Sequence, residues 1–257
     1  MTQAGNSHKG TLDMGNRRDL AKLPRTNELT EDDWLRELKH IDDQLTRVLD
    51  AFNFLEELIR LSNESEPALS AFNKTPLFWH VFRDSLQESM FMGLGRLCDN
   101  FPDVINVSRV LQGAMGHPEF FSKEALRRRL TKRGLTDSLA EHLIKTAWCP
   151  ESGPDFKPLK TAISLHLRRL EQIYVPIRGS YYGHRSIEAD AQAMFEKTNR
   201  DELGETLDTL RQLVGGLQFL YDNGVEPRVD MLGTKALDLA SRGYVRDVVT
   251  AVAGREL

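Results

Sequence analysis

The chain has 257 residues, which is enough for one large domain or two small ones with a substantial core. Its formal net charge of −4 excludes a surface coated with cations, so any contact with nucleic acid must be confined to a local cleft. The two cysteines, Cys98 and Cys149, stand in unrelated contexts, which argues against disulfides and cysteine-based zinc sites. No apolar run approaches the roughly 20 residues of a membrane-spanning helix. We therefore expect a cytoplasmic protein with no membrane segment.

The first part of the chain predicts a polar tail followed by a long helix. Residues 1–28 lack the apolar core of a secretory signal, so we expect a flexible tail. Thr30 then precedes three acidic residues, which is typical of the capped start of a helix. From Trp34 to Ile59, large apolar residues recur at alternating spacings of four and three. This pattern predicts an amphipathic helix with one apolar seam that ends near Ser62.

Three more long helices are predicted farther along the chain. One, at about 76–99, is apolar over a wide arc, which predicts a place in the middle of a helical bundle. The next runs from about Leu159 into Arg178, and the last covers 201–223, where Asn223-Gly224 is typical of a left-handed C-cap. Shorter or weaker helical patterns cover 68–73, 107–114, 122–133, 136–148 and 231–252.

No stretch shows convincing strand alternation, so the chain is predicted to be all-α. We expect a helical bundle at 29–226, interrupted by a helical insertion at about 105–150. Residues 227–257 are expected to form a C-terminal helical appendage.

The segment 177–185, Ile-Arg-Gly-Ser-Tyr-Tyr-Gly-His-Arg, carries the strongest chemical signal. Arg178 and His184 stand with five residues between them at the end of a long helical pattern. Arginine is a permanent cation shaped to bind phosphate, and histidine transfers protons near neutral pH. Metal-free RNA cleavage needs both groups. His184 would move protons at the 2′-hydroxyl or the leaving 5′-oxygen, and Arg178 would neutralise charge on the phosphate.

The spacing alone is weak evidence, because chance would give about two such pairs in this composition. In a straight helix, the two side chains would also point about 120° apart and differ by about 9 Å in height. The backbone must therefore bend, for which Pro176, Gly179 and Gly183 provide the means, or a second copy must supply the missing group. The alternative interpretation is that Arg178 caps a helix end and His184 lies on the surface.

Other residues extend this candidate site. Tyr181 or Tyr182 could stack on a base or donate a hydrogen bond, and Arg185 adds a cation beside His184. A cluster of basic residues in the predicted insertion could hold the RNA backbone, or could form the solvated face of a helix; it comprises Arg127, Arg128 and Arg129, followed by Lys132 and Arg133. Arg96 and Asp99 could form a pair that braces the cleft, or a structural ion pair at a helix end.

Two further histidine–arginine pairs, His80 with Arg83 and His166 with Arg169, share helix faces but are more often structural. The spacing of His184, Glu188 and Asp190 matches no metal-ligand pattern. The chain also lacks a P-loop, a dinucleotide-binding glycine motif and a nucleophile elbow. We therefore predict neither a metal nor a cofactor.

Three features together resemble a known family. They are Phe78–Leu86 followed by Gly93–Asp99, the late helix that ends in Arg178 and His184, and the helix at 201–221. In order and helical setting, they resemble the HEPN superfamily of ribonucleases and RNA-binding domains, and more closely its AbiU-type branch, associated with abortive phage infection. The similarity covers about residues 30–225.

This resemblance implies an RNA substrate and a homodimer in which Arg178 and His184 of both copies line one RNA-cleaving cleft. It also implies a phage-defence or toxin–antitoxin role, with a nucleotidyltransferase antitoxin as a partner. Active members usually carry Asn, Asp or His after the arginine, where this chain has Gly179. Members modified by the antitoxin carry Tyr two places after the histidine, where this chain has Ser186. The alternatives are a catalytically silent module that binds RNA, a nucleotide or a partner, and a helical scaffold that dimerises through the third long helix.

Overall fold

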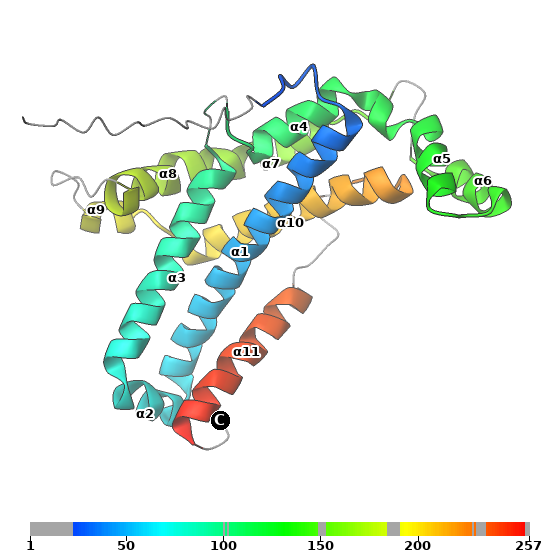
Figure 1. Ribbon diagram of the computed structural model, residues 1–257. Helices are drawn as coiled ribbons and strands as arrows, with labels where there is room; N and C mark the ends of the chain where they lie inside the picture. The colour runs from blue at the N-terminus through cyan, green and yellow to red at the C-terminus, as the bar shows by residue number, and fades with distance from the viewer. Residues whose placement is uncertain are drawn as a thin grey trace, which may run out of the picture.

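The structure is a computed structural model, and it describes residues 23–99, 101, 103–148, 153–183, 191–227, 229 and 235–254. Every regular element in these ranges is helical, which confirms the predicted all-α helical bundle (Figure 1). Within the same ranges, no helix combines the length and the apolar character needed to cross a bilayer.

One half of the bundle is a helical hairpin. Helix α1 (Glu31–Glu64) and helix α3 (Pro76–Leu97) run antiparallel, with the short α2 (Glu66–Lys74) at the turn, and α11 (Lys235–Ala253) packs on α1 and α2 (Figure 1). Helix α1 begins as predicted, because the Thr30 hydroxyl accepts from the Asp33 N–H and the Asp33 carboxylate accepts from the Thr30 N–H.

The other half contains a helical run from 157 to 183 that lies beside α10 (Arg200–Asn223) and α4 (Val107–Gly116). The run comprises α7 (Lys157–Arg169), the π-helical η2 (Leu170–Tyr174), α8 (Val175–Ile177) and the π-helical η3 (Arg178–Gly183). The short α9 (Ala191–Phe195) lies in a stretch that was not predicted to be helical. Together these elements and α1 and α3 enclose the main core.

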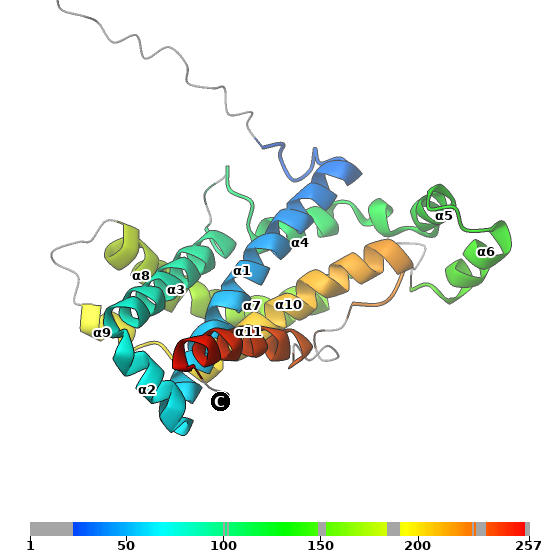
Figure 2. The ribbon, with the colours of Figure 1, turned by 60° about the horizontal axis from the view of Figure 1, so that its bottom comes forward.

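Helices α5 (Lys123–Lys132) and α6 (Asp137–Thr146) form a hairpin at the far end of the molecule (Figures 1 and 2). They share a small core of their own, whereas α4 and the short 3-10 helix η1 (Pro118–Phe121) join the main core. Gly224 ends α10 in the left-handed conformation that its sequence predicts, with φ 66°. An added Cβ there would lie 2.6 Å from the Cβ of Ala147, so the glycine also lets α6 approach α10.

The expected central position of α3 is wrong for the N-terminal half of the helix. Leu77, Phe78 and Val81 are 75%, 53% and 55% exposed. The cause is the hairpin turn at α2, which places this half of α3 at the tip of the molecule, where α1 and α2 cover one side of it (Figure 1). Ile59, expected in the seam of α1, is also exposed, because α2 and α11 pack on the neighbouring face of that helix.

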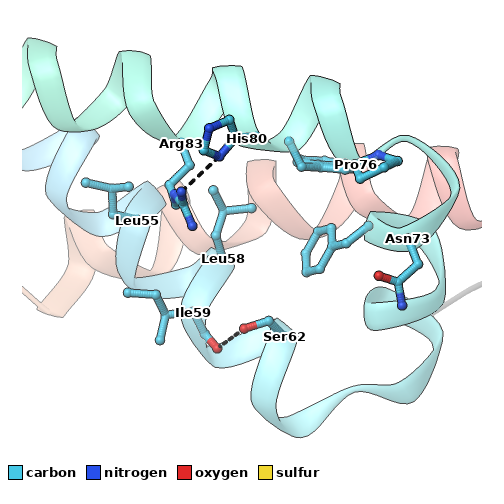
Figure 3. A pocket seen from close by; sticks show the side chains of 10 residues that line it. Leu55, Leu58, Ile59, Ser62, Asn73, Pro76, His80 and Arg83 are labelled. Carbon is cyan, nitrogen blue, oxygen red and sulfur yellow. Dashed lines mark hydrogen bonds between the residues drawn. The ribbon is translucent and has the colours of Figure 1, made fainter.

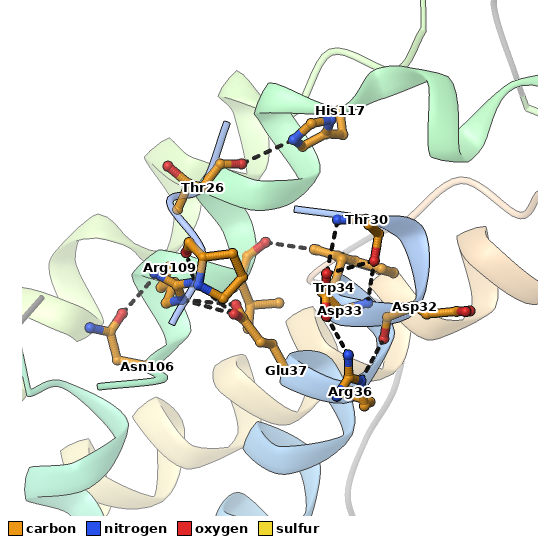
Figure 4. A network of polar contacts seen from close by, with 12 residues as sticks. Thr26, Thr30, Asp32, Asp33, Trp34, Arg36, Glu37, Asn106, Arg109 and His117 are labelled. Atoms are coloured by element: carbon orange, nitrogen blue, oxygen red, sulfur yellow. Dashed lines mark hydrogen bonds and ion pairs between the residues drawn. The ribbon is translucent and has the colours of Figure 1, made fainter. Parts of the chain in front are cut away.

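A buried polar network anchors the segment that precedes α1 (Figure 4). Arg109 of α4 pairs with Glu37 of α1 at 2.7 Å and also donates to the carbonyl of Pro24 at 2.6 Å. A ring nitrogen of His117 lies 3.0 Å from the Thr26 carbonyl oxygen. The end of the predicted tail therefore lies against α4 from Leu23 onward.

The Glu37–Arg109 pair yields a stability prediction. Because both side chains are buried, Glu37→Ala would leave a guanidinium without its counter-charge, and we expect unfolding free energy to fall by about 3 kcal/mol. Glu141→Ala, which breaks the exposed pair with Arg127, should cost less than about 1 kcal/mol. Urea unfolding followed by circular dichroism measures both. Equal losses for the two variants would contradict this assignment.

His166 is buried between α7 and α10, with Nδ1 3.1 Å from the Thr206 hydroxyl. Burial lowers the pKa of His166 below 6.5, so the unfolded chain binds its proton more readily than the folded one. We expect stability to decrease as the pH falls below about 6.5, and His166→Gln to lose this part of the pH dependence. Measurements of the unfolding free energy between pH 5 and 8 test this. The control is His80→Gln, at an exposed histidine, which should leave the slope of unfolding free energy against pH unchanged. If His166→Gln left this slope unchanged, the role assigned to His166 would be refuted.

Candidate functional site

The first residue of η3, Arg178, pairs with Asp99 just beyond the end of α3. Its Nη1 lies 2.8 Å from Asp99 Oδ2, and the side chains are 28% and 10% exposed. The backbone carbonyl of Asp99 accepts a 2.6 Å hydrogen bond from the side chain of Asn106, which caps α4. Asp99 is therefore fixed through its backbone by Asn106, while its carboxylate binds Arg178. Part of the Arg178 side chain stays open to solvent.

Gly95 gives Arg178 its path across α3. A Cβ at Gly95 would overlap with Cδ of Arg178 and lie 2.9 Å from its Cγ and 3.0 Å from its Nε. The aliphatic stem of the arginine therefore lies directly on the glycine, one turn before Asp99. Any larger side chain at this position would force the guanidinium away from the carboxylate.

The backbone passes Pro176 by changing its hydrogen-bond register. The N–H of Val175 donates to the carbonyl of Leu170, five residues back, and the N–H of Arg178 donates to that of Val175, three residues back. Proline lacks a donor and clashes with an α-helical carbonyl, so the wide turn before it lets the helix continue. The irregular backbone that was predicted here takes the form of π-helical turns in an unbroken run. Such turns occur often at functional sites.

Aromatic packing holds η3 against α3. Tyr182 is half-buried and stacks on Phe91 with ring centroids 5.5 Å apart, and Phe195 of α9 lies edge-on to both. Burial raises the pKa of Tyr182 to about 12, so its hydroxyl is protonated at neutral pH and acts as a donor, never as a base. Tyr181 packs edge-on against Tyr182 but is 40% exposed. Of the two tyrosines, only Tyr181 presents much ring surface to solvent.

Two of the predicted site residues, His184 and Arg185, lie outside the described residues. Arg96 is exposed and makes no ion pair with any residue that the structure describes. The expected pairing of Arg96 with Asp99 is therefore wrong, because Arg178 reaches Asp99 from the other helical run.

The basic cluster of α5 lies at the opposite end of the same protomer from η3 (Figures 1 and 2). Three of its arginines already have carboxylate partners: Arg127 pairs with Glu141, and Arg128 and Arg129 both pair with Glu31. Arg133 donates to the backbone carbonyl of Asp222. Arg129 is largely buried and lies 4.0 Å above the ring of Tyr221. Within one copy, this cluster is not part of the site around Arg178.

Comparison with known protein families matches residues 31–248 to AbiU2, a family of HEPN domains. The chain belongs to the AbiU2 family. The match runs from the start of α1 into α11, so it includes Gly95, Asp99 and Arg178. Comparisons with curated proteins and with solved structures found no significant match.

A second histidine–arginine pair of this AbiU2 chain lies at the edge of an apolar pocket (Figure 3). Leu55 and Ile59 of α1 help to line this cavity of about 300 Å³. Arg83 Nη2 lies 3.0 Å from His80 Nδ1, and His80 Nε2 lies 3.2 Å from a carboxylate oxygen of Asp84. These groups bind one another at the tip of the hairpin, away from Arg178. The residues that the structure describes form no group of potential metal ligands.

Gly95 provides the structural test of this AbiU2 site. Gly95→Ala gains helix propensity but displaces Arg178, so we expect it to remove most of the stability that Asp99 contributes. In a double-mutant cycle, Gly95→Ala and Asp99→Ala should couple by at least about 0.5 kcal/mol. Gly215→Ala, where an added Cβ meets nothing within 4 Å, is the control and should couple with Asp99→Ala by about zero. Additive losses for Gly95→Ala and Asp99→Ala would show that the pair does not depend on the glycine.

Proposed function

We propose that the chain is a metal-independent endoribonuclease of a phage-defence or toxin–antitoxin system. The observation that carries the proposal is the guanidinium of Arg178, which Asp99 and Gly95 hold in place while part of it stays open to solvent. A phosphate-binding arginine must be oriented before the substrate arrives, because ordering it later would reduce catalysis. Membership of the AbiU2 family supports the same reading.

In the proposed reaction, His184 removes the proton from a ribose 2′-hydroxyl, and the 2′-oxygen attacks the adjacent phosphorus. The bond between phosphorus and the 5′-oxygen breaks, and an imidazolium protonates the leaving oxygen. The products are a 2′,3′-cyclic phosphate and a 5′-hydroxyl end. Arg178 stabilises the negative charge that develops on the phosphate oxygens during the attack.

The proposed active form is a homodimer. The Arg178 and His184 side chains of both copies would line one shared cleft, in which Arg178 of one copy acts with the histidine of the other. The exposed apolar residues Leu77, Phe78 and Val81 at the tip of α3 support self-association in general, because exposed apolar patches are often covered by a partner, but they lie away from Arg178. A nucleotidyltransferase antitoxin, implied by the family resemblance, completes the proposed system. Modification of a tyrosine near the histidine is not part of it, because Ser186 stands there.

Cleavage of transfer RNA and total RNA in the presence of EDTA tests the proposed activity. We expect the wild-type protein to cut, and His184→Ala and Arg178→Ala each to lower the rate by at least about 100-fold. Asp99→Asn should lower it less, because the arginine remains but is held more loosely. Arg47→Ala, an exposed arginine on α1, should cut like wild type. Equal cleavage by wild type and His184→Ala would reject the catalytic role.

Mixing inactive variants tests the shared cleft. If Arg178 of one copy acts with the partner's His184, a heterodimer of Arg178→Ala with His184→Ala contains one intact site and recovers activity. Recovery up to about half of the wild-type rate per dimer is the expected result. No recovery in a verified heterodimer would show that both groups act within one copy.

A catalytically silent module that binds RNA is the second candidate function, and Gly179 is the observation that favours it. Nothing lies within 4 Å of a Cβ added there, so the polar side chain of active relatives would fit but is missing. This alternative requires that the wild-type protein never cuts, yet binds RNA through a contact that Arg178→Glu weakens.

A further inference from the structure

Helices α4 and α7 lie side by side (Figures 1 and 2). Side chains of both helices line a groove with a volume of about 190 Å³. Its apolar lining includes Leu111, Met115, Ile163 and Leu167. The remaining lining side chains are polar or charged. A groove with an apolar floor and polar edges suits a ligand that has both an uncharged body and ionic groups.

Two cations line the α7 side of this groove. Lys160 and Arg168 stand eight residues apart with Ser164 between them, so all three lie on one face of the helix, over about 12 Å. Both cations are exposed, and neither forms an ion pair with any described residue. Arg169, the next residue, faces α10 and pairs with Glu202 and Glu205. The groove therefore carries two cations that α7 does not use for packing.

The α4 side of the groove supplies uncharged hydrogen-bonding groups. Ser108 and Gln112 stand one turn apart on α4 and line the groove with a hydroxyl and an amide. Glu171 lies at the end of the groove nearer to Arg178 and repels a phosphate there. Phosphate contacts consequently fall to Lys160 and Arg168.

The two helices that line the groove are each linked to the pair of Arg178 and Asp99. On one side, α7 leads through η2 and α8 to Arg178, ten residues and about 15 Å beyond Arg168. On the other side, the hydrogen bond between Asn106 and Asp99 ties the start of α4 to the same pair. A few nucleotides of single-stranded RNA span that distance.

From this arrangement, we propose that the groove between α4 and α7 binds the phosphodiester backbone of RNA that flanks the scissile linkage. This inference rests on the proposed function. It adds a binding path for the RNA (the path), defined as the groove from Lys160 to Arg168. Lys160 and Arg168 contact successive stretches of backbone, while Ser108, Ser164 and Gln112 bond to sugars or phosphate oxygens. Such contacts carry no sequence information, so they raise affinity equally for different RNAs.

Fluorescence anisotropy with labelled oligouridylates of 4, 8 and 12 nucleotides tests the path, in the uncleaving His184→Ala background. For the 12-mer, Lys160→Ala/Arg168→Ala should weaken binding by at least about 10-fold and reduce the slope of log affinity against log salt by about 1.4. The same substitutions should change the affinity for the 4-mer only slightly. The control is Lys39→Ala/Arg47→Ala on α1, which also removes an exposed lysine and arginine eight residues apart and should leave both quantities unchanged.

The outcomes separate this path from the nuclease proposal. If Lys160→Ala/Arg168→Ala cleaves RNA with an unchanged KM while Arg178→Ala does not cleave, the path is overturned and the nuclease stands. If wild type never cleaves but the groove variant loses length-dependent binding, the path stands and the nuclease fails. If inorganic phosphate or uridine monophosphate competes as well as RNA and length has no effect, the groove holds a small phosphate and the path is overturned.

Discussion

The geometry of the candidate site depends on one ion pair between segments 79 residues apart in the sequence. Arg178 opens η3, Asp99 follows α3, and Gly95 provides the surface that the arginine crosses. Asp99 is itself held by Asn106 at the start of α4. Three segments, the end of α3, the start of α4 and η3, therefore meet at Asp99. A pair with one partner mostly buried needs such support, since an unsupported buried charge is unstable.

Other arginines of the chain are engaged in ion pairs away from Arg178. Arg128 and Arg129 pair with Glu31 and attach the α5–α6 hairpin to α1, whereas Arg127 pairs with Glu141 inside the hairpin. Arg83 is engaged with His80 and Asp84 at the tip of the hairpin. With a net charge of −4, most arginines find carboxylates within the fold. For that reason, the solvent-exposed Lys160 and Arg168, which line the groove between α4 and α7, are candidates for binding a ligand.

The fold could be predicted where local signals decide it. The Thr30 cap, the end of α10 at Gly224 and the long helical periods each depend on residues close in sequence, and the structure confirms them. The prediction that all of α3 lies in the middle of the bundle was wrong for its N-terminal half. Apolar periodicity predicts that a helix face is covered, but it does not identify the element or partner that covers it. Leu77, Phe78 and Val81 fit that pattern and are exposed in a single copy.

The sequence predicted individual residues of the site but not the contacts between them. Arg178 and Asp99 were both singled out, but Asp99 was matched with Arg96, its neighbour on the same helix, because sequence shows neighbours and not contacts between distant segments. Gly95 gave an unused signal: a glycine inside a buried helix is unfavourable by about 1 kcal/mol, so its presence suggests a close approach. Pro176 indicated irregular backbone correctly, but a proline signal does not distinguish a π-helical turn from a bend.

The π-helical turns make the site sensitive to the number of residues before it. A π turn holds one residue more than an α turn, and one residue rotates all that follows by about 100°. Arg178 faces Asp99 because η2 contains that surplus residue. Deleting any one position between 170 and 174 would leave every functional side chain present in the sequence, yet would turn the guanidinium away from the carboxylate. The length of η2 therefore controls the Arg178–Asp99 pair as directly as the identity of residue 178 does.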